Sequence, residues 1–201
     1  MKITGQIVNL PALTTWVKEL PTEVFERAAI SALNKTVGMA KTEMSRQIRA
    51  EFNLPASVVN EGLRIQRATS SHGNMSWQAV LESPNVKGRS MNLIHFDARA
   101  DRSGVSVKIK RAGGRKVVAG AFIANKGRTV FRRVPGTTMN SRSRYTGTKH
   151  AEQIVPVQTI AVSQMFNTTR INAAVVEFIE SKLPDVFAHE AAFFLERHRA
   201  K

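Results

Sequence analysis

A chain of 201 residues, of which 42% are hydrophobic, is long enough to bury a core and too apolar to be disordered throughout, so we expect a single domain. The absence of cysteine excludes disulfides, thiolate metal sites and cysteine nucleophiles. A formal net charge of +15 favours phosphate polymers or acidic protein surfaces as partners.

The charge is concentrated in the middle of the chain. Residues 87–149 contain 16 Lys and Arg and two acids, Asp97 and Asp101, which gives +14. The rest of the chain holds 14 Lys and Arg and 13 acids, which gives +1. The sequence therefore predicts a nearly neutral helical frame around a basic, β-rich middle. Charge alone leaves nucleic acid and acidic protein equally open as partners of that middle.

Two helices are predicted before residue 53. Apolar residues at helical spacing predict a short amphipathic helix over 11–20. A proline-free run with apolar residues every three or four positions predicts a long helix over 22–52. The apolar stripe turns by roughly 180° over that length, so this helix either bends near Gly38 or contacts different neighbours at its two ends. A curved helix within the core is the simpler alternative.

From Pro55 onward the pattern changes from helical to alternating. Proline restricts the residue before it, so the long helix ends at 53–54, and 56–62 adds a turn or two. Alternation of apolar and polar residues then predicts strands, with a loop rich in Ser, Gly and Asn over 70–74. The predicted strands cover 63–67, 75–81, 91–96 and 104–110, and a turn over 111–115 follows the last of them.

The stretch 117–134 predicts a β-hairpin. Residues 117–123 carry no charge, which favours a strand buried on both faces, and this interpretation assigns Phe122 to the core. Gly127 supplies the positive φ that hairpin turns need, and 129–134 forms the return strand. The turn and return strand carry Lys126, Arg128, Arg132 and Arg133. These cations form either a contact surface or a solvated edge that prevents strand-to-strand aggregation.

After the hairpin, the sequence predicts a polar segment, a short extended segment and then helices. Residues 135–151 are rich in Ser and Thr and have little to bury, which indicates either a disordered insertion or an arm that orders against a partner. An extended segment over 154–157 precedes helices over 159–166 and 168–182. Because proline suits a first helical turn better than a helix interior, a separate last helix is predicted over 184–198.

The order of elements predicts an α+β fold. N-terminal helices, one of them long, precede a mainly antiparallel β-sheet, and C-terminal helices follow. The single domain over 1–201 then comprises a helical part, a basic β-rich part, a flexible loop or arm and a second helical part. Their bounds are 1–62, 63–134, 135–151 and 152–201.

No catalytic constellation is visible. His189 and Glu190 begin a zinc-binding His-Glu-x-x-His pattern, but Phe193 stands where the second histidine would be. Phosphate-binding loops and Gly-x-Ser-x-Gly elbows are missing. We therefore expect no enzymatic activity, no metal and no cofactor. Neither a secretory leader nor a membrane span is expected, because polar residues and prolines interrupt every apolar stretch.

Several stretches together resemble one family, the lambdoid phage minor tail protein Z, also described as a tail completion protein. They are AAISALNKTVGMAKTEMSRQIRAEFNLP (28–55), VVNEGLRIQRAT (58–69), VVAGAFIANKGRTVFRRV (117–134) and IVPVQTIAVSQMF (154–166). The resemblance implies an α+β structural protein that acts late in tail assembly, at the head-proximal end of a long tail. It implies relatives that form rings, and it carries no catalytic residues over to this chain.

Two functions are open at this stage. The first is a non-enzymatic tail completion subunit in the virion tail, assembled in the host cytoplasm, with other tail or neck proteins, further copies of itself and phage DNA as partners. The second is a nonspecific DNA-binding protein that uses the basic middle. Either would use the cations of that middle. The candidate contact residues are Arg111, Arg115, Lys116, Lys126, Arg128, Arg132, Arg133, Arg142, Arg144 and Lys149.

Overall fold

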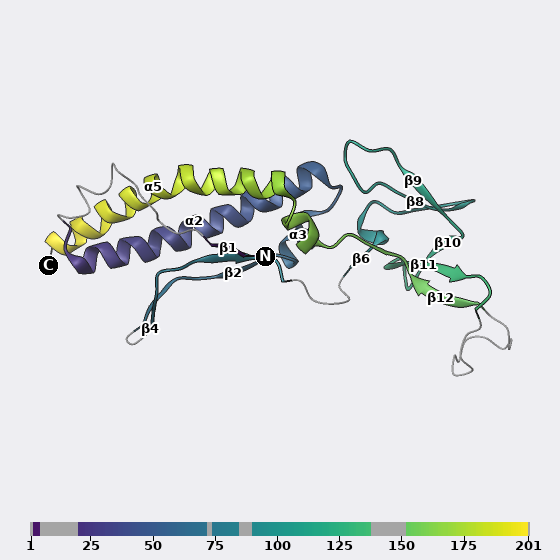
Figure 1. Ribbon diagram of the computed structural model, residues 1–201, viewed down its shortest axis with the longest axis horizontal. Coiled ribbons are helices and arrows are strands. Elements are labelled where there is room, and N and C mark those ends of the chain that lie inside the picture. Colours follow the sequence, from purple (N-terminus) through teal and green to yellow (C-terminus); the bar gives the residue numbers. More distant parts are fainter. Residues whose placement is uncertain (1, 5–19, 72–73, 85–89, 138–151, 201) are drawn as a thin grey trace. The chain divides into compact units, whose positions relative to one another are not determined.

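The computed structural model describes residues 2–4, 20–71, 74–84, 90–137 and 152–200 (Figure 1). All but the last residue of the helix predicted over 11–20 lies outside these residues, as does most of the predicted arm. Long helices near both ends and antiparallel strands between them confirm the α+β fold. The chain forms two compact units. Unit 1 comprises Met1–Ile48, Val59–Asn85 and Val162–Lys201, and unit 2 comprises Arg49–Val58 and Val86–Ala161. The single domain expected from the chain's length stays a prediction.

Unit 1 is built on two long helices that lie side by side (Figure 1). The first, α2 (Thr22–Glu51), confirms the predicted helix and passes through Gly38 without interruption. Phe25, near its start, contacts Phe187, late in the second helix, with ring centroids 5.8 Å apart, so the two helices run antiparallel. Alanines fully buried in α2 allow a close approach of neighbouring elements. They are Ala28, Ala29, Ala32 and Ala40.

The second long helix, α5 (Thr169–Arg199), is continuous, so the prediction of a separate helix starting at Pro184 was wrong. A proline inside a helix leaves the carbonyl four residues earlier without its N–H partner, which costs about 3 kcal/mol. Leu183 and Phe187 flank the proline and are 6% and 3% exposed. Burying each of these side chains contributes about 1.5–3 kcal/mol, which offsets the cost of the proline.

A small sheet completes the core of unit 1. Strands β1 (Lys2–Thr4), β5 (Val80–Glu82) and β2 (Arg64–Gln66) pair antiparallel in the order β1-β5-β2. Leu81 of β5 lines a small cavity together with Leu33 of α2 and Leu183 of α5, so the sheet and both helices share one core.

The Asn34 side chain also connects α2 to the segment beside this sheet. It donates to the Ala68 carbonyl at 3.0 Å and accepts from the Ala68 N–H at 2.9 Å.

The sequence prediction was less accurate between 69 and 82. Strands β3 (Thr69–Ser71) and β4 (Asn74–Ser76) form a hairpin where a longer loop was predicted. The single strand predicted over 75–81 is two strands, β4 and β5, separated by Trp77, Gln78 and Ala79. Ring contact between Trp77 and Phe25, with centroids 5.5 Å apart, accompanies this break in the alternation.

Unit 2 begins with the last residues of α2. The short helix α3 (Ala56–Glu61) follows Pro55 as predicted, and the chain returns to unit 1 within it, at Val59. The strand predicted over 91–96 was wrong. Only β6 (Met91–Asn92) is extended, and it pairs with β13 (Gln158–Thr159) before a 3-10 turn over Leu93–His95. The Asn92 side chain causes this change, because its oxygen accepts from the Ile94 N–H at 3.1 Å and ends the extended conformation.

The first three-stranded sheet of unit 2 has the order β7-β8-β9. Its strands are β7 (Arg99–Asp101), β8 (Gly104–Val107) and β9 (Lys116–Ala119). The predicted alternation in β8 is confirmed, since Val105 and Val107 are buried and Ser106 between them is not. The strand ends at Val107, three residues before its predicted end.

The second sheet contains the predicted hairpin. Its order is β10-β11-β12, with strands β10 (Ala121–Ala124), β11 (Thr129–Val134) and β12 (Gln153–Pro156). The pairing of β10 with β11 confirms the hairpin, and β12 confirms the extended segment. The doubly buried strand over 117–123 was wrong. Gly120, at φ 67°, turns the chain between β9 and β10, and Val117 on β9 is 50% exposed.

The helix predicted over 159–166 is shorter than expected. Strand β13 occupies Gln158–Thr159, and α4 (Val162–Phe166) begins after it. Met165 and Phe166 of α4 are fully buried and anchor the start of α5 in unit 1.

Candidate interaction surface

The tip of the central hairpin is a basic turn. Residues 125–128 connect β10 to β11, and the Arg128 N–H donates to the Asn125 carbonyl at 3.1 Å. Asn125, Lys126 and Gly127 all have positive φ, at 56°, 54° and 79°. Asparagine and glycine tolerate this conformation, but for lysine it costs roughly 1 kcal/mol. The side chains of Lys126 and Arg128 are exposed at this turn.

One face of the sheet β10-β11-β12, here called the aromatic face, is half-exposed along its whole width. The register places Phe122 opposite Phe131 and Phe131 opposite Pro156, and directly opposite residues share one face of a sheet. Arg133 and Ile154 are likewise opposite each other on this face. The aromatic face comprises Phe122, Ala124, Thr129, Phe131, Arg133, Ile154 and Pro156, none of which is buried.

An aromatic pair and a cation lie at the centre of this face. The rings of Phe122 and Phe131 are stacked, with centroids 6.1 Å apart and planes inclined by 28°. The guanidinium carbon of Arg133 lies 5.7 Å from the Phe122 centroid, within the range of a cation–π contact. This arrangement fixes the Arg133 side chain against an apolar support while Arg133 remains exposed.

The opposite face of the same sheet points into unit 2. Ala121 and Val130 are buried there, and the Val130 N–H and carbonyl bond the Asn92 side chain at 2.8 and 3.0 Å. Arg132 belongs to this face by its register with Ala121 and Val155, but its side chain is exposed at the end of the sheet. Arg132 and Arg133 therefore point to opposite sides of β11.

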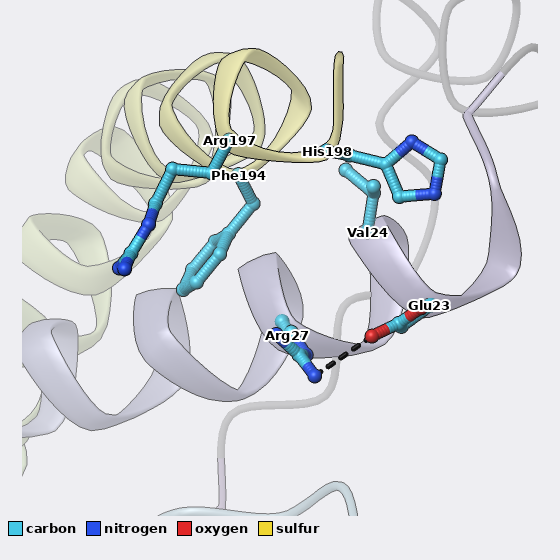
Figure 2. A pocket seen from close by; sticks show the side chains of 6 residues that line it. All are labelled: Glu23, Val24, Arg27, Phe194, Arg197 and His198. Atoms are coloured by element: carbon cyan, nitrogen blue, oxygen red, sulfur yellow. Dashed lines mark ion pairs between the residues drawn. The ribbon is translucent and has the colours of Figure 1, made fainter. Parts of the chain in front are cut away.

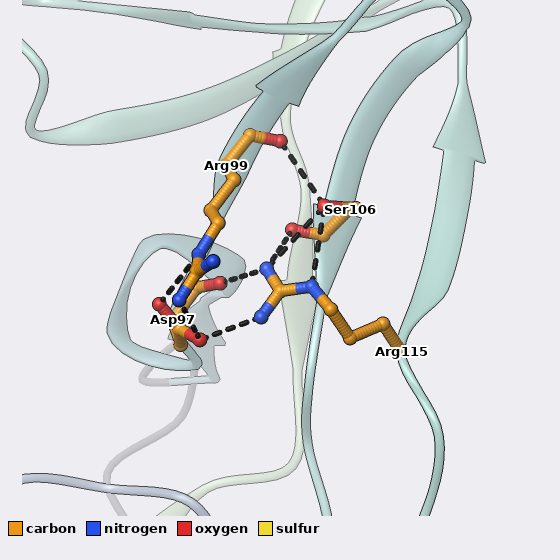
Figure 3. Close-up of polar contacts among 4 residues, drawn as sticks. All are labelled: Asp97, Arg99, Ser106 and Arg115. Carbon is orange, nitrogen blue, oxygen red and sulfur yellow. Dashed lines mark hydrogen bonds and ion pairs between the residues drawn. The ribbon is translucent and has the colours of Figure 1, made fainter.

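Arg115, another predicted contact residue, is held by unit 2 itself (Figure 3). Its guanidinium bonds the Asp97 carboxylate at 2.5 Å and the Ser106 carbonyl at 3.0 Å, while Arg99 bonds the same carboxylate at 3.2 Å. The hydrogen bonds from Arg115 and Arg99 lower the pKa of Asp97 below its ordinary 3.8. One of the two acids of the basic middle is thus neutralised by two cations of that middle.

The remaining predicted contact residues lie apart from the hairpin or outside the described residues. Arg111 and Lys116 are exposed in the connection that joins β8 to β9 and at the start of β9. Arg142, Arg144 and Lys149 lie outside the described residues. The hairpin carries Lys126, Arg128, Arg132 and Arg133, as the sequence predicted, but Arg132 and Arg133 lie on opposite faces of β11.

Sequence reasoning missed the aromatic face because it assigned Phe122 to the core. The signal that could have found it was the length of the turn. A four-residue turn over 125–128 fixes the register of the hairpin, and that register puts Phe122 opposite Phe131 and two residues from Arg133.

Unit 1 contains a cavity of about 380 Å³ between the start of α2 and the end of α5 (Figure 2). Val24 and Phe194 form its apolar lining, and Arg27 is paired with Glu23 at 2.7 Å. Arg197 and His198 complete the lining. Among the described residues no group of three His, Cys, Asp or Glu is placed to hold a metal ion.

A membrane-spanning helix must be both long and apolar. No helix in the described part of the chain combines the length and apolar character needed to cross a bilayer.

The comparison with protein families gives a match. The model of the family described as prophage minor tail protein Z (GPZ) matches residues 13–200 of the 201. No curated protein and no solved structure matches the chain. Because the family model covers both long helices and all of the strands from β2 to β13, the chain belongs to the prophage minor tail protein Z family.

Proposed function

We propose that the chain is a non-catalytic tail completion subunit, which acts in tail assembly and head–tail joining at the head-proximal end of the tail. Its family membership makes it a structural protein of a prophage tail that interacts with other tail proteins. The match over nearly the whole chain carries the proposal. We propose further that the subunit assembles in the host cytoplasm and works as a homo-oligomer.

The surface of unit 2 fits a role in protein contact. Unit 2 presents a half-exposed aromatic face beside a basic hairpin tip, which are features of a docking surface. Behind the hairpin, two hydrogen bonds between the Asn92 side chain and the Val130 backbone tie β11 to β6 of unit 2.

Deleting the gene for this chain from its prophage tests the proposal. After induction we expect tails to form but plaque-forming particles to fall to a small fraction of the normal yield, with few heads joined to tails in electron micrographs. A plasmid copy of the wild-type gene should restore the yield. Normal infectivity of the deleted phage would contradict the proposal.

A second candidate function is nonspecific DNA contact, favoured by the unpaired cations of unit 2. Several exposed or half-exposed cations have no carboxylate partner in the described part of the chain. They include Arg102, Lys108, Arg111, Lys116, Lys126, Arg128, Arg132 and Arg133. Phosphates of DNA passing through a tail would be neutralised by such a surface, with release of condensed counterions.

DNA contact predicts a steep dependence of affinity on salt. If the hairpin tip binds phosphates, the double variant Lys126→Gln, Arg128→Gln should reduce the slope of log affinity against log salt by about 0.9 for each phosphate that is no longer neutralised. The measurement is sedimentation with short duplex DNA between roughly 50 and 200 mM salt, the range in which binding to phosphates weakens sharply. Lys182→Gln, on the exposed side of α5, is the matched control. Salt-independent binding, or none, removes this function.

A further inference from the structure

We propose that the aromatic face of β10-β11-β12 docks onto another tail protein through an apolar patch of that protein bordered by carboxylates. The inference rests on the proposed function, since it names the chemistry of the partner that such a tail subunit meets. It assigns the contact to Phe122, Phe131, Ile154 and Arg133 rather than to the basic residues as a whole.

The apolar part of the argument is the exposure of this face. Four of its seven residues are Phe, Ile or Pro, and all four remain half-exposed or exposed. The opposite face of the same sheet already buries Ala121 and Val130 in unit 2, so the aromatic face is not needed for that core. A contiguous apolar surface of this kind on a soluble protein marks a contact site.

The cations on and beside the aromatic face indicate that carboxylates surround the apolar patch of the partner. Arg133 on the face, and Lys126 and Arg128 at the adjoining turn, lack carboxylate partners in the described residues. Arg133 lies over the Phe122 ring, and a guanidinium in a cation–π contact keeps N–H groups available for two parallel hydrogen bonds to a carboxylate. A partner with carboxylates around an apolar patch would cover the apolar side chains of the aromatic face and pair with its cations.

Nucleic acid fits this face less well than protein does. Arg133 lies over the Phe122 ring, and Phe122 and Phe131 are stacked on each other, so these rings do not form an open platform for bases. Phosphates would pair with the cations but would leave Phe131, Ile154 and Pro156 without a partner. A second copy docked face to face on the same surface is disfavoured, because the cations of the two faces would repel each other. Copies in the proposed homo-oligomer would then meet through other surfaces.

Binding to purified tails tests the inference. The probe is tails produced from the same prophage with the gene for this chain deleted, mixed with purified chain and sedimented. We expect Arg133→Glu and Ile154→Asp each to weaken the association about tenfold or more. Arg132→Glu is the matched control, since it makes the same charge change one residue away on the opposite face, and it should alter the association less than about twofold.

The outcomes separate the two proposals. Both variants must keep the far-ultraviolet circular dichroism of the wild type, and weakened binding by either folded variant then supports the inference. If wild-type chain binds tails and both folded variants bind equally well, the inference is overturned while the tail role stands. If wild-type chain does not bind these tails, both fail. Association of the chain with itself or with duplex DNA that disappears in Arg133→Glu, while tail binding persists, also overturns the inference.

Discussion

Replacing Gly104 by alanine is expected to destabilise unit 2 by about 3–5 kcal/mol, which is at the high end for a single substitution. Gly104 begins β8 with φ at 149°, a conformation that residues with a side chain rarely adopt. A Cβ at this position would lie 2.1 Å from the Val118 carbonyl oxygen and 3.1 Å from the Ala119 Cα. Since both neighbours are backbone atoms of β9, only a shift of that strand could relieve the clash.

The measurement is chemical unfolding of the variant, together with hydrogen exchange of the amides in β8 and β9. Loss of the pairing between Gly104 and Ala119 should raise exchange along both strands. Gly114→Ala is the matched control, because its added Cβ meets nothing within 4 Å and its φ is not positive. A Gly104→Ala variant as stable as the Gly114→Ala variant would contradict the conformation described for this strand.

Local turn chemistry made the central hairpin predictable. Gly127 marked the turn, and a strand rich in Thr, Val and Phe followed it, so hairpin and turn were both correct. The uncharged run before it was misinterpreted because a short apolar run has no periodicity that separates one buried strand from two strands and a turn. Gly120 was the one sequence signal for a turn within this run. The strand pairing of the folded protein is needed to show that β9 pairs with β8 while β10 pairs with β11.

The error at Pro184 has a different cause. Local preference placed a helix boundary there, since proline is unfavourable in a helix interior. Packing against residues far away in sequence overrides this boundary, because Leu183 lines a cavity together with Leu33 of α2 and Phe187 contacts Phe25. Such contacts between residues about 150 positions apart cannot be derived from the pattern of one segment.

The candidate surface was predicted in part for the same reasons. Composition found the cations of the hairpin, because charge is visible without a fold. It did not distinguish Arg115, which is held by Asp97 and Ser106, from Arg133, which is presented on a half-exposed face. That distinction depends on register and on which side of a strand each residue lies.

The contact between α2 and α5 provides a second large effect. The Glu190 carboxylate is 4% exposed and accepts from the Lys35 ammonium at 2.5 Å and from the Ser31 hydroxyl at 2.6 Å. We expect Lys35→Met to destabilise unit 1 by about 2–4 kcal/mol at neutral pH, because it leaves a buried carboxylate without its counter-charge. Lys41→Met, a change on the same helix at a lysine without an ion pair in the described residues, is the control and should have little effect.

The pH dependence of that loss distinguishes the ion pair from simple packing. Burial raises the pKa of Glu190, but hydrogen bonds from Lys35 and Ser31 and the charges of Lys35 and His189 bring that pKa below its ordinary 4.5. In the wild type this carboxylate therefore stabilises the fold above about pH 4.5, and the contribution is lost as pH falls through the lowered pKa. Without Lys35, burial dominates and raises the pKa of Glu190. The folded variant therefore loses stability as pH rises through that raised pKa.

The difference in unfolding free energy between the wild type and Lys35→Met should then be largest near pH 7 and should narrow toward about pH 4.5. Urea unfolding at several pH values measures it. Because Glu190→Gln removes the charge but keeps a side chain of the same shape, that variant should show a smaller loss with little dependence on pH. If Lys35→Met lowers the unfolding free energy by the same amount at every pH, the lysine stabilises the helices through the packing of its aliphatic chain and not through its charge.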